Sequence, residues 1–276
     1  MKWHFIILSL FVNLPLFCMS QLVCNIDKKT FLPGEVLQYQ LYYNVGFVWI
    51  QAGTCEFKVR SATCDQKSVY QLMINGKTQK SFDTFYKVRD TIISYVDSEN
   101  LLPLRAYKYT HEDTWNGIDE FFFKRDTGGW KVTTRLQRRR YWKEPTESRT
   151  IHCGFDIATS IYRFRCLSDE RLYVKGRRFE IPVRLDDGEY NVSIVYLGKE
   201  RIKLYGDGYY TAHAFKLTLV EGNVFKRGDA LKMWISDDGN KIPLLIESPI
   251  RVGTVKALFR RAERTIYPTQ KADNKK

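Results

Sequence analysis

The sequence predicts a mainly β protein whose antiparallel sheets curl into an open barrel or a β-roll, with one central helix and one short helix. Three observations support this. Apolar and polar residues alternate along about a dozen short segments, turns rich in Gly and Asp separate these segments, and one segment near the middle has helical spacing. Period-two alternation is typical of strands that bury one face. Many such strands joined by tight turns form sheets that curl or pack together.

The first half of the chain contains most of the clear alternation. A Pro33-Gly34 turn precedes the first strand, in which Leu37, Tyr39 and Leu41 share one face. The same pattern predicts strands over residues 55–60, 69–74, 91–97, 104–110, 118–124 and 130–136.

Two segments have helical rather than strand spacing. Phe82 and Phe85 predict a short helix over residues 81–88, with Ser81 as its N-cap. The central helix is predicted over residues 156–165, because Asp156 can cap it and Ile157 and Ile161 lie on one stripe.

The second half again reads as strands joined by acidic turns. The alternation predicts strands over 179–185, 190–196, 201–205, 210–220, 232–236, 242–247 and 252–259. We expect one β-rich domain over residues 21–265, divisible into halves 31–150 and 167–265 that the helical region 155–166 joins. Residues 266–276 are polar and are expected to form a disordered tail.

The N-terminus indicates export. Lys2 is followed by an apolar run that Asn13 and Pro15 interrupt, so the run is shorter than the roughly 20 residues of a spanning helix. We expect residues 1–20 to be a cleaved signal peptide and the protein to be periplasmic or extracellular. Lipidation at Cys18 is not expected, because the bulky Phe17 directly before it fits that processing badly.

Charge and cysteines narrow the partners and the chemistry. The net charge of +13 favours anionic partners such as lipid head groups or acidic glycans, including peripheral membrane association, and export argues against nucleic acid. Cys55 and Cys64 are close enough in sequence to pair across a hairpin, whereas a helix between Cys153 and Cys166 would hold them roughly 20 Å apart. An oxidising compartment permits such bonds.

No catalytic, cofactor or metal motif is evident in the sequence. The acidic turns at 186–189 and 237–240 fit hairpin turns better than calcium sites, and Asp119 and Glu120 point to opposite faces of one strand. We therefore expect a protein that is not an enzyme.

Aromatic residues are the remaining candidate site. Tyr43, Trp49, Phe85 and Trp234 are the candidates for lining a ligand cleft, where aromatic rings can pack on lipid or stack on sugars. The competing interpretation is that they belong to the core.

Ordered sequence blocks resemble a bacterial family called domain of unknown function 3108. They are residues 33–39 with Gly46 and 52–54, then 85–90, 94–97 with 102–103, 156–162, 234–238, 241–243 and 252–255. Together they cover about residues 31–262, and the end of the central helix departs from the family pattern. The resemblance implies an exported β-rich protein, and it implies no catalytic residues.

Three functional hypotheses remain. The first is a non-catalytic envelope protein that holds an amphiphilic ligand, lipid or glycan, or an envelope partner, within the curved sheet. The second is a hydrolase acting on envelope glycans, for which Asp90, Asp97, His213 and Asp237 would have to converge. The third is a structural or assembly partner, which an exposed apolar patch would favour.

Overall fold

A computed structural model describes residues 24–272, apart from residues 27, 46–47, 169, 187, 219–229 and 251–252. The expected signal peptide at 1–20 and Cys18 lie outside the described residues. Within them, the protein is built from β-strands and one α-helix.

The strands follow one another along almost the whole chain. They are β1 (Val36–Val45), β2 (Val48–Cys64), β3 (Lys67–Thr78), β4 (Arg89–Asp97), β5 (Pro103–Glu112), β6 (Trp115–Asp126), β7 (Gly129–Arg138), β8 (Tyr141–Trp142), β9 (Thr146–Thr150), β10 (Arg178–Leu185), β11 (Gly188–Leu204), β12 (Gly208–Thr218), β13 (Ala230–Ser236), β14 (Pro243–Pro249) and β15 (Thr254–Glu263). Helix α2 (Ile157–Arg165) and the 3₁₀ helix η1 (Glu170–Tyr173) lie between β9 and β10.

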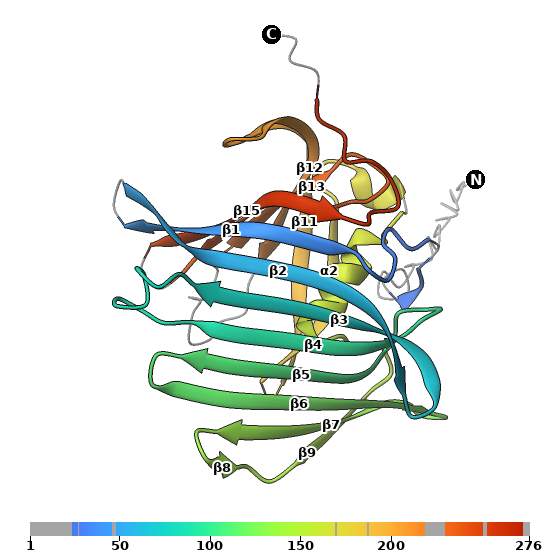
Figure 1. Ribbon diagram of the computed structural model, residues 1–276. Helices are drawn as coiled ribbons and strands as arrows, with labels where there is room; N and C mark the ends of the chain where they lie inside the picture. Colours follow the sequence, from blue (N-terminus) through green and yellow to red (C-terminus); the bar gives the residue numbers. More distant parts are fainter. Residues whose placement is uncertain are drawn as a thin grey trace, which may run out of the picture.

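All the strands belong to one antiparallel sheet. Its order is β10-β11-β12-β13-β14-β15-β1-β2-β3-β4-β5-β6-β7-β8, and β9 also pairs with β7. The sheet curls around α2 without closing (Figure 1). The predicted fold class is therefore confirmed. The two expected halves share this continuous sheet, because β15 pairs with β1.

The alternation predicted from the sequence sets the two faces of the sheet. In β1, Leu37 and Tyr39 are buried while Gln38 and Gln40 are half-exposed. Leu37 pairs with Phe57 of β2, whose ring centroid lies 6.3 Å from that of Tyr162 in α2. We call the face that carries Leu37, Tyr39 and Phe57 the inner face, and the opposite face the outer face.

Helix α2 forms where the sequence predicts it. The Asp156 side chain accepts the backbone N–H of Thr159, which satisfies one free donor at the helix start. Tyr162 and Phe164 are buried, and they pack into two apolar clusters that together form the core.

The predicted short helix over residues 81–88 is wrong. Residues 80–85 form consecutive turns, and their hydrogen bonds alternate between three-residue and four-residue spacing. The Asp83 carboxylate accepts hydrogen bonds from Thr78 and Arg89, which draws the segment back onto the ends of β3 and β4. The periodic aromatic residues that suggested a helix therefore lie in a turn.

The cysteine pairing also differs from the expectation. Cys24 forms a disulfide with Cys153, with their Cα atoms 5.8 Å apart. Cys55 and Cys64 both lie on β2 and are unpaired, because nine residues of extended strand separate them by about 30 Å.

Two further boundaries differ from the sequence interpretation. The segments predicted as strands 190–196 and 201–205 form one strand, β11, with a register irregularity between Tyr196 and Gly198. Part of the expected disordered tail is held against the sheet: Lys271 pairs with Asp207 at 2.5 Å, and the N–H of Ala272 donates to the carbonyl of Tyr209.

Candidate functional site

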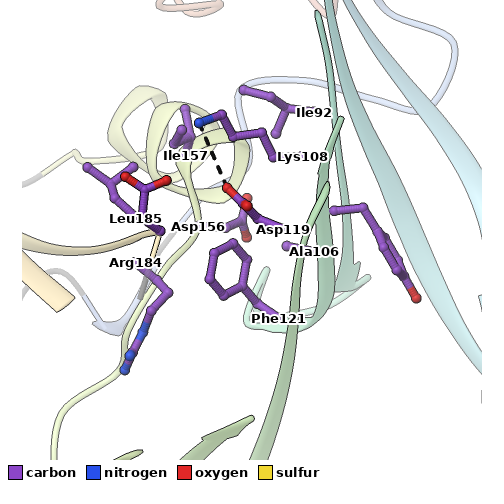
Figure 2. A pocket seen from close by; sticks show the side chains of 11 residues that line it. Ile92, Ala106, Lys108, Asp119, Phe121, Asp156, Ile157, Arg184 and Leu185 are labelled. Atoms are coloured by element: carbon purple, nitrogen blue, oxygen red, sulfur yellow. Dashed lines mark ion pairs between the residues drawn. The ribbon is translucent and has the colours of Figure 1, made fainter. Parts of the chain in front are cut away.

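One small cavity lies between α2 and the inner face of the sheet. The cavity there has a volume of about 10 Å³ and is lined by residues that include Lys108, Asp119 and Asp156 (Figure 2). A volume of that size holds about one water molecule. The expectation of a ligand within the curved sheet is therefore not met at this cavity.

The polar groups around this cavity pair with one another. Asp119 is contacted by Arg138 and lies 3.9 Å from the Lys108 ammonium. Burial raises the pKa of Asp119, and the Arg138 hydrogen bond opposes that shift. Burial likewise raises the pKa of Asp156, although Ser94 and Thr159 both donate to its carboxylate. These contacts are what a buried polar network needs for stability.

A much larger open volume lies on the other side of the sheet. It is a groove of about 640 Å³ across β15, β1, β2, β3 and β4. It is lined by Gln38, Tyr39, Gln40, Thr54, Cys55, Glu56, Asn75, Gly76, Lys77, Arg89, Asp90, Thr91 and Arg260. Most of these side chains alternate away from the inner face, so we call this the outer groove.

The outer groove is polar and presents both donors and acceptors. Gln38, Gln40 and Asn75 contribute amides, and Thr54 and Thr91 contribute hydroxyls. An amide can donate and accept at once, as a sugar hydroxyl also can. The lining is therefore suited to a hydroxyl-rich ligand.

Two of the groove's cations have no carboxylate within ion-pair distance in the described part of the chain. Arg260 donates to the Tyr42 hydroxyl at 2.6 Å, and no ion pair involves it or Lys77. In contrast, Arg89 is paired with Asp83 and Glu56 is paired with Lys58. The groove therefore carries a surplus of positive charge.

Asp90 is a carboxylic acid in the groove lining whose pKa is shifted from its ordinary value. Burial raises its pKa to about 6, and the backbone N–H of His111, 2.9 Å from the carboxylate, opposes the shift. Asp90 also lies opposite Gly76, where there is open space beside the backbone.

The structure brings Tyr43 and Phe85 close together outside the groove, and it places Trp49 at the same hairpin end but on the opposite face from Tyr43. Tyr43 stacks edge-on against Phe82, which contacts Phe85. Trp49 lies in β2 beside the same hairpin end, beneath the Lys256 ammonium. Trp234 is elsewhere, on the outer face of β13, where its indole N–H donates to Glu200.

The acidic and histidine candidates converge only in part. His213 Nε2 lies 2.7 Å from the Asp237 carboxylate, and Nδ1 lies 2.9 Å from the Tyr196 hydroxyl. Burial lowers the pKa of His213, helped by the nearby Lys241 ammonium. Asp90 lies in the groove instead, and Asp97 accepts backbone N–H groups in the turn after β4.

The two acidic segments connect paired strands: Leu185 pairs with Gly188 across the first, and β13 pairs with β14 across the second. Asp186 lies 3.4 Å from Arg138, and Asp237 is paired with Lys199. No group of three His, Cys, Asp or Glu residues among those described is arranged to hold a metal ion. None of the described helices has the length and apolar character needed to cross a bilayer.

Sequence reasoning missed the outer groove. Most of its residues occupy polar positions of five strands, and such positions look like an ordinary solvated face. The register that brings Gln40, Thr54 and Lys77 into one row is long-range, so no local pattern shows it.

Comparisons with known proteins extend this description. A family model described as "Protein of unknown function (DUF3108)" matches residues 38–260. The structure resembles a crystal structure of a β-barrel-like protein of domain of unknown function DUF1849 from Brucella abortus, with a TM-score of 0.56 and 9% identity. That match covers 85% of this chain and 99% of the other, and it concerns the fold alone. No curated protein matches the chain.

Proposed function

Because this chain belongs to the family of proteins of unknown function DUF3108, its ligand has to be inferred from its own surface, and we propose that it is a non-catalytic exported envelope protein that binds an acidic glycan in the outer groove. The observation that carries the proposal is the groove itself. It combines a volume of about 640 Å³ with amide and hydroxyl groups and the two cations Lys77 and Arg260.

Electrostatics favours an anionic over a neutral sugar. A carboxylate or phosphate on the ligand would pair with Lys77 and Arg260, neither of which has a carboxylate within ion-pair distance in the described structure, although Arg260 also donates to the Tyr205 carbonyl and helps to lower the pKa of Asp207. The overall charge of +13 would also attract an acidic polymer. Lipid tails fit less well, because the side chains that face into the groove are mainly polar.

Two observations support export. The sequence begins with the pattern of a signal peptide. The Cys24–Cys153 disulfide joins residues 129 positions apart, and such bonds persist in oxidising compartments such as the periplasm. Fractionation of cells that express the full chain would test this location.

The groove is tested by removing its unpaired charge. We expect the double variant Lys77→Gln/Arg260→Gln to bind a hexamer of galacturonic acid about tenfold more weakly than the unaltered protein, a loss of about 1.4 kcal/mol. Titration calorimetry measures the affinity, and binding should weaken further as salt screens the charges.

A matched control removes the same charge elsewhere. Lys175→Gln/Arg178→Gln neutralises two exposed cations beyond the groove lining and should leave the affinity unchanged. A neutral glucose hexamer and vesicles of anionic phospholipid serve as competing ligands. Equal losses in both double variants, or tighter binding to the neutral hexamer, would refute the acidic-glycan proposal.

The hydrolase is a second candidate, and one observation favours it. Asp237, His213 and Tyr196 form a hydrogen-bonded row that runs from the end of β13 across β12 to β11, with Lys241 beside it. Under our proposal the protein releases no reducing ends from galacturonic acid oligomers. Release that Asp237→Asn abolishes would instead establish the hydrolase.

A further inference from the structure

One end of the curled sheet carries an exposed apolar patch. It consists of Val48, Trp49 and Ile50 at the start of β2, Tyr43 in β1, and Phe82, Phe85 and Tyr86 in the turn between β3 and β4; we call this set the end patch. In Figure 1 these segments lie at the left of the view, on the far side from α2. Phe85 is 81% exposed and Val48 is 60% exposed.

The hairpin end and the turn that carry the patch are held together, and the patch covers both faces of the hairpin end, because Trp49 lies opposite Asn44 and points away from the face of Ile50. Tyr43 pairs directly with Ile50, and its ring centroid lies 5.9 Å from that of Phe82. Backbone and side-chain bonds between Gln79 and residues 51–52 hold the turn against β2. The two segments are therefore fixed beside each other although they are far apart in sequence.

Cations surround the apolar side chains. Lys80 and Lys87 flank the turn, are exposed, and form no ion pair in the described structure. The Lys256 ammonium lies 4.4 Å from the centre of the Trp49 ring. Of the acids near the patch, Asp83 pairs with Arg89 and Glu247 pairs with Lys256, while Glu112 accepts the Tyr86 hydroxyl at 2.8 Å and Asp113 donates its backbone N–H to the carbonyl of Lys87.

This combination fits a membrane surface. Trp and Tyr are enriched where a protein meets the boundary between lipid head groups and tails. Exposed apolar groups can enter that boundary while neighbouring lysines lie among anionic head groups. A contiguous apolar patch on an otherwise polar surface marks an interaction site.

We infer that the end patch docks the protein on the surface of an anionic bilayer, inserting Trp49 and Phe85 and placing Lys80 and Lys87 against the head groups. This goes beyond glycan binding, because the patch residues are not part of the outer groove lining. The contact is peripheral, made by the end of a hairpin and a neighbouring turn.

The test uses the purified protein and vesicles of phosphatidylglycerol mixed with phosphatidylcholine. We expect the protein to sediment with these vesicles and to bind pure phosphatidylcholine at least tenfold more weakly. The double variant Trp49→Ala/Phe85→Ala should bind anionic vesicles at least tenfold more weakly than the unaltered protein. Lys80→Gln/Lys87→Gln should remove the preference for anionic vesicles.

The chain offers a closely matched control. Trp142 and Tyr141 have exposures of 44% and 81%, against 42% and 81% for Trp49 and Phe85, and Trp142 also lies under a cation. Trp142→Ala/Tyr141→Ala should bind vesicles as the unaltered protein does, and circular dichroism should show all variants folded. Equal losses in both aromatic pairs would overturn the inference. So would an unaltered protein that binds no vesicles, which would leave the patch to a protein partner.

Discussion

At the residue scale, Asp156 shows how one side chain can both define an element and cost stability. Its carboxylate caps α2 through Thr159 and also accepts the Ser94 hydroxyl from β4. Burial nevertheless raises its pKa, so ionisation is less favourable in the folded protein than in the unfolded chain. Helix α2 therefore needs a hydrogen-bond acceptor at position 156, but it does not need a negative charge there.

This predicts a pH dependence with a definite sign. A raised carboxyl pKa contributes stability below the pKa of unfolded aspartate, about 3.9, and that contribution is lost as pH rises through the folded pKa. Asp156→Asn keeps an acceptor for Thr159 without the charge. It should therefore be at least as stable as the unaltered protein at neutral pH and lose that advantage in acid. Urea unfolding across a pH series measures the difference.

The comparison variant is Asp156→Ala, which removes the cap at every pH. It should lower the free energy of unfolding by about 1–2 kcal/mol. If Asp156→Asn were as unstable as Asp156→Ala at neutral pH, the charge itself would be stabilising and the argument from burial would fail.

At the element scale, the sequence predicts what is local. Alternation such as Leu37-Gln38-Tyr39-Gln40 fixes a strand and the residues that it buries, and Asp156 before an apolar stripe fixes α2. The short helix fails because the spacing of Phe82 and Phe85 also suits a turn, and the Asp83 carboxylate bonds to Thr78 and Arg89 at the flanking strand ends instead of facing solvent on a helix.

The candidate sites depend on pairing between strands, which the sequence leaves open. Tyr43, Trp49 and Phe85 could be selected as aromatic candidates, yet their position at one end of the sheet depends on the β1–β2 register and on the turn held by Gln79. The outer groove needs the pairing of β15 with β1, which joins the last strand to the first. The periodicity of apolar residues predicts each strand but does not indicate which strands pair with each other.

At the scale of the whole molecule, a buried ion pair links three distant parts of the chain. Arg165 at the end of α2 donates to both Glu35 carboxylate oxygens, at 2.6 and 2.9 Å, and to the carbonyl of Asn240. Both charged side chains are fully buried. The pair therefore ties the entry to β1 and the turn before β14 to the helix that fills the curled sheet.

Replacing both members of the pair should cost far less stability than removing Arg165 alone. Arg165→Met leaves the Glu35 carboxylate buried without a partner, so we expect the free energy of unfolding to fall by about 3–5 kcal/mol. In the double variant Glu35→Leu/Arg165→Met, no buried charge remains and the thioether can pack on the Phe31 and Tyr162 rings that Arg165 now contacts. Most of the loss should be recovered in urea unfolding. Lys58→Met, which breaks a partly exposed pair with Glu56, is the control and should cost less than about 1 kcal/mol. A double variant as unstable as Arg165→Met would mean that the bond to Asn240, and not the unpaired charge, holds these parts together.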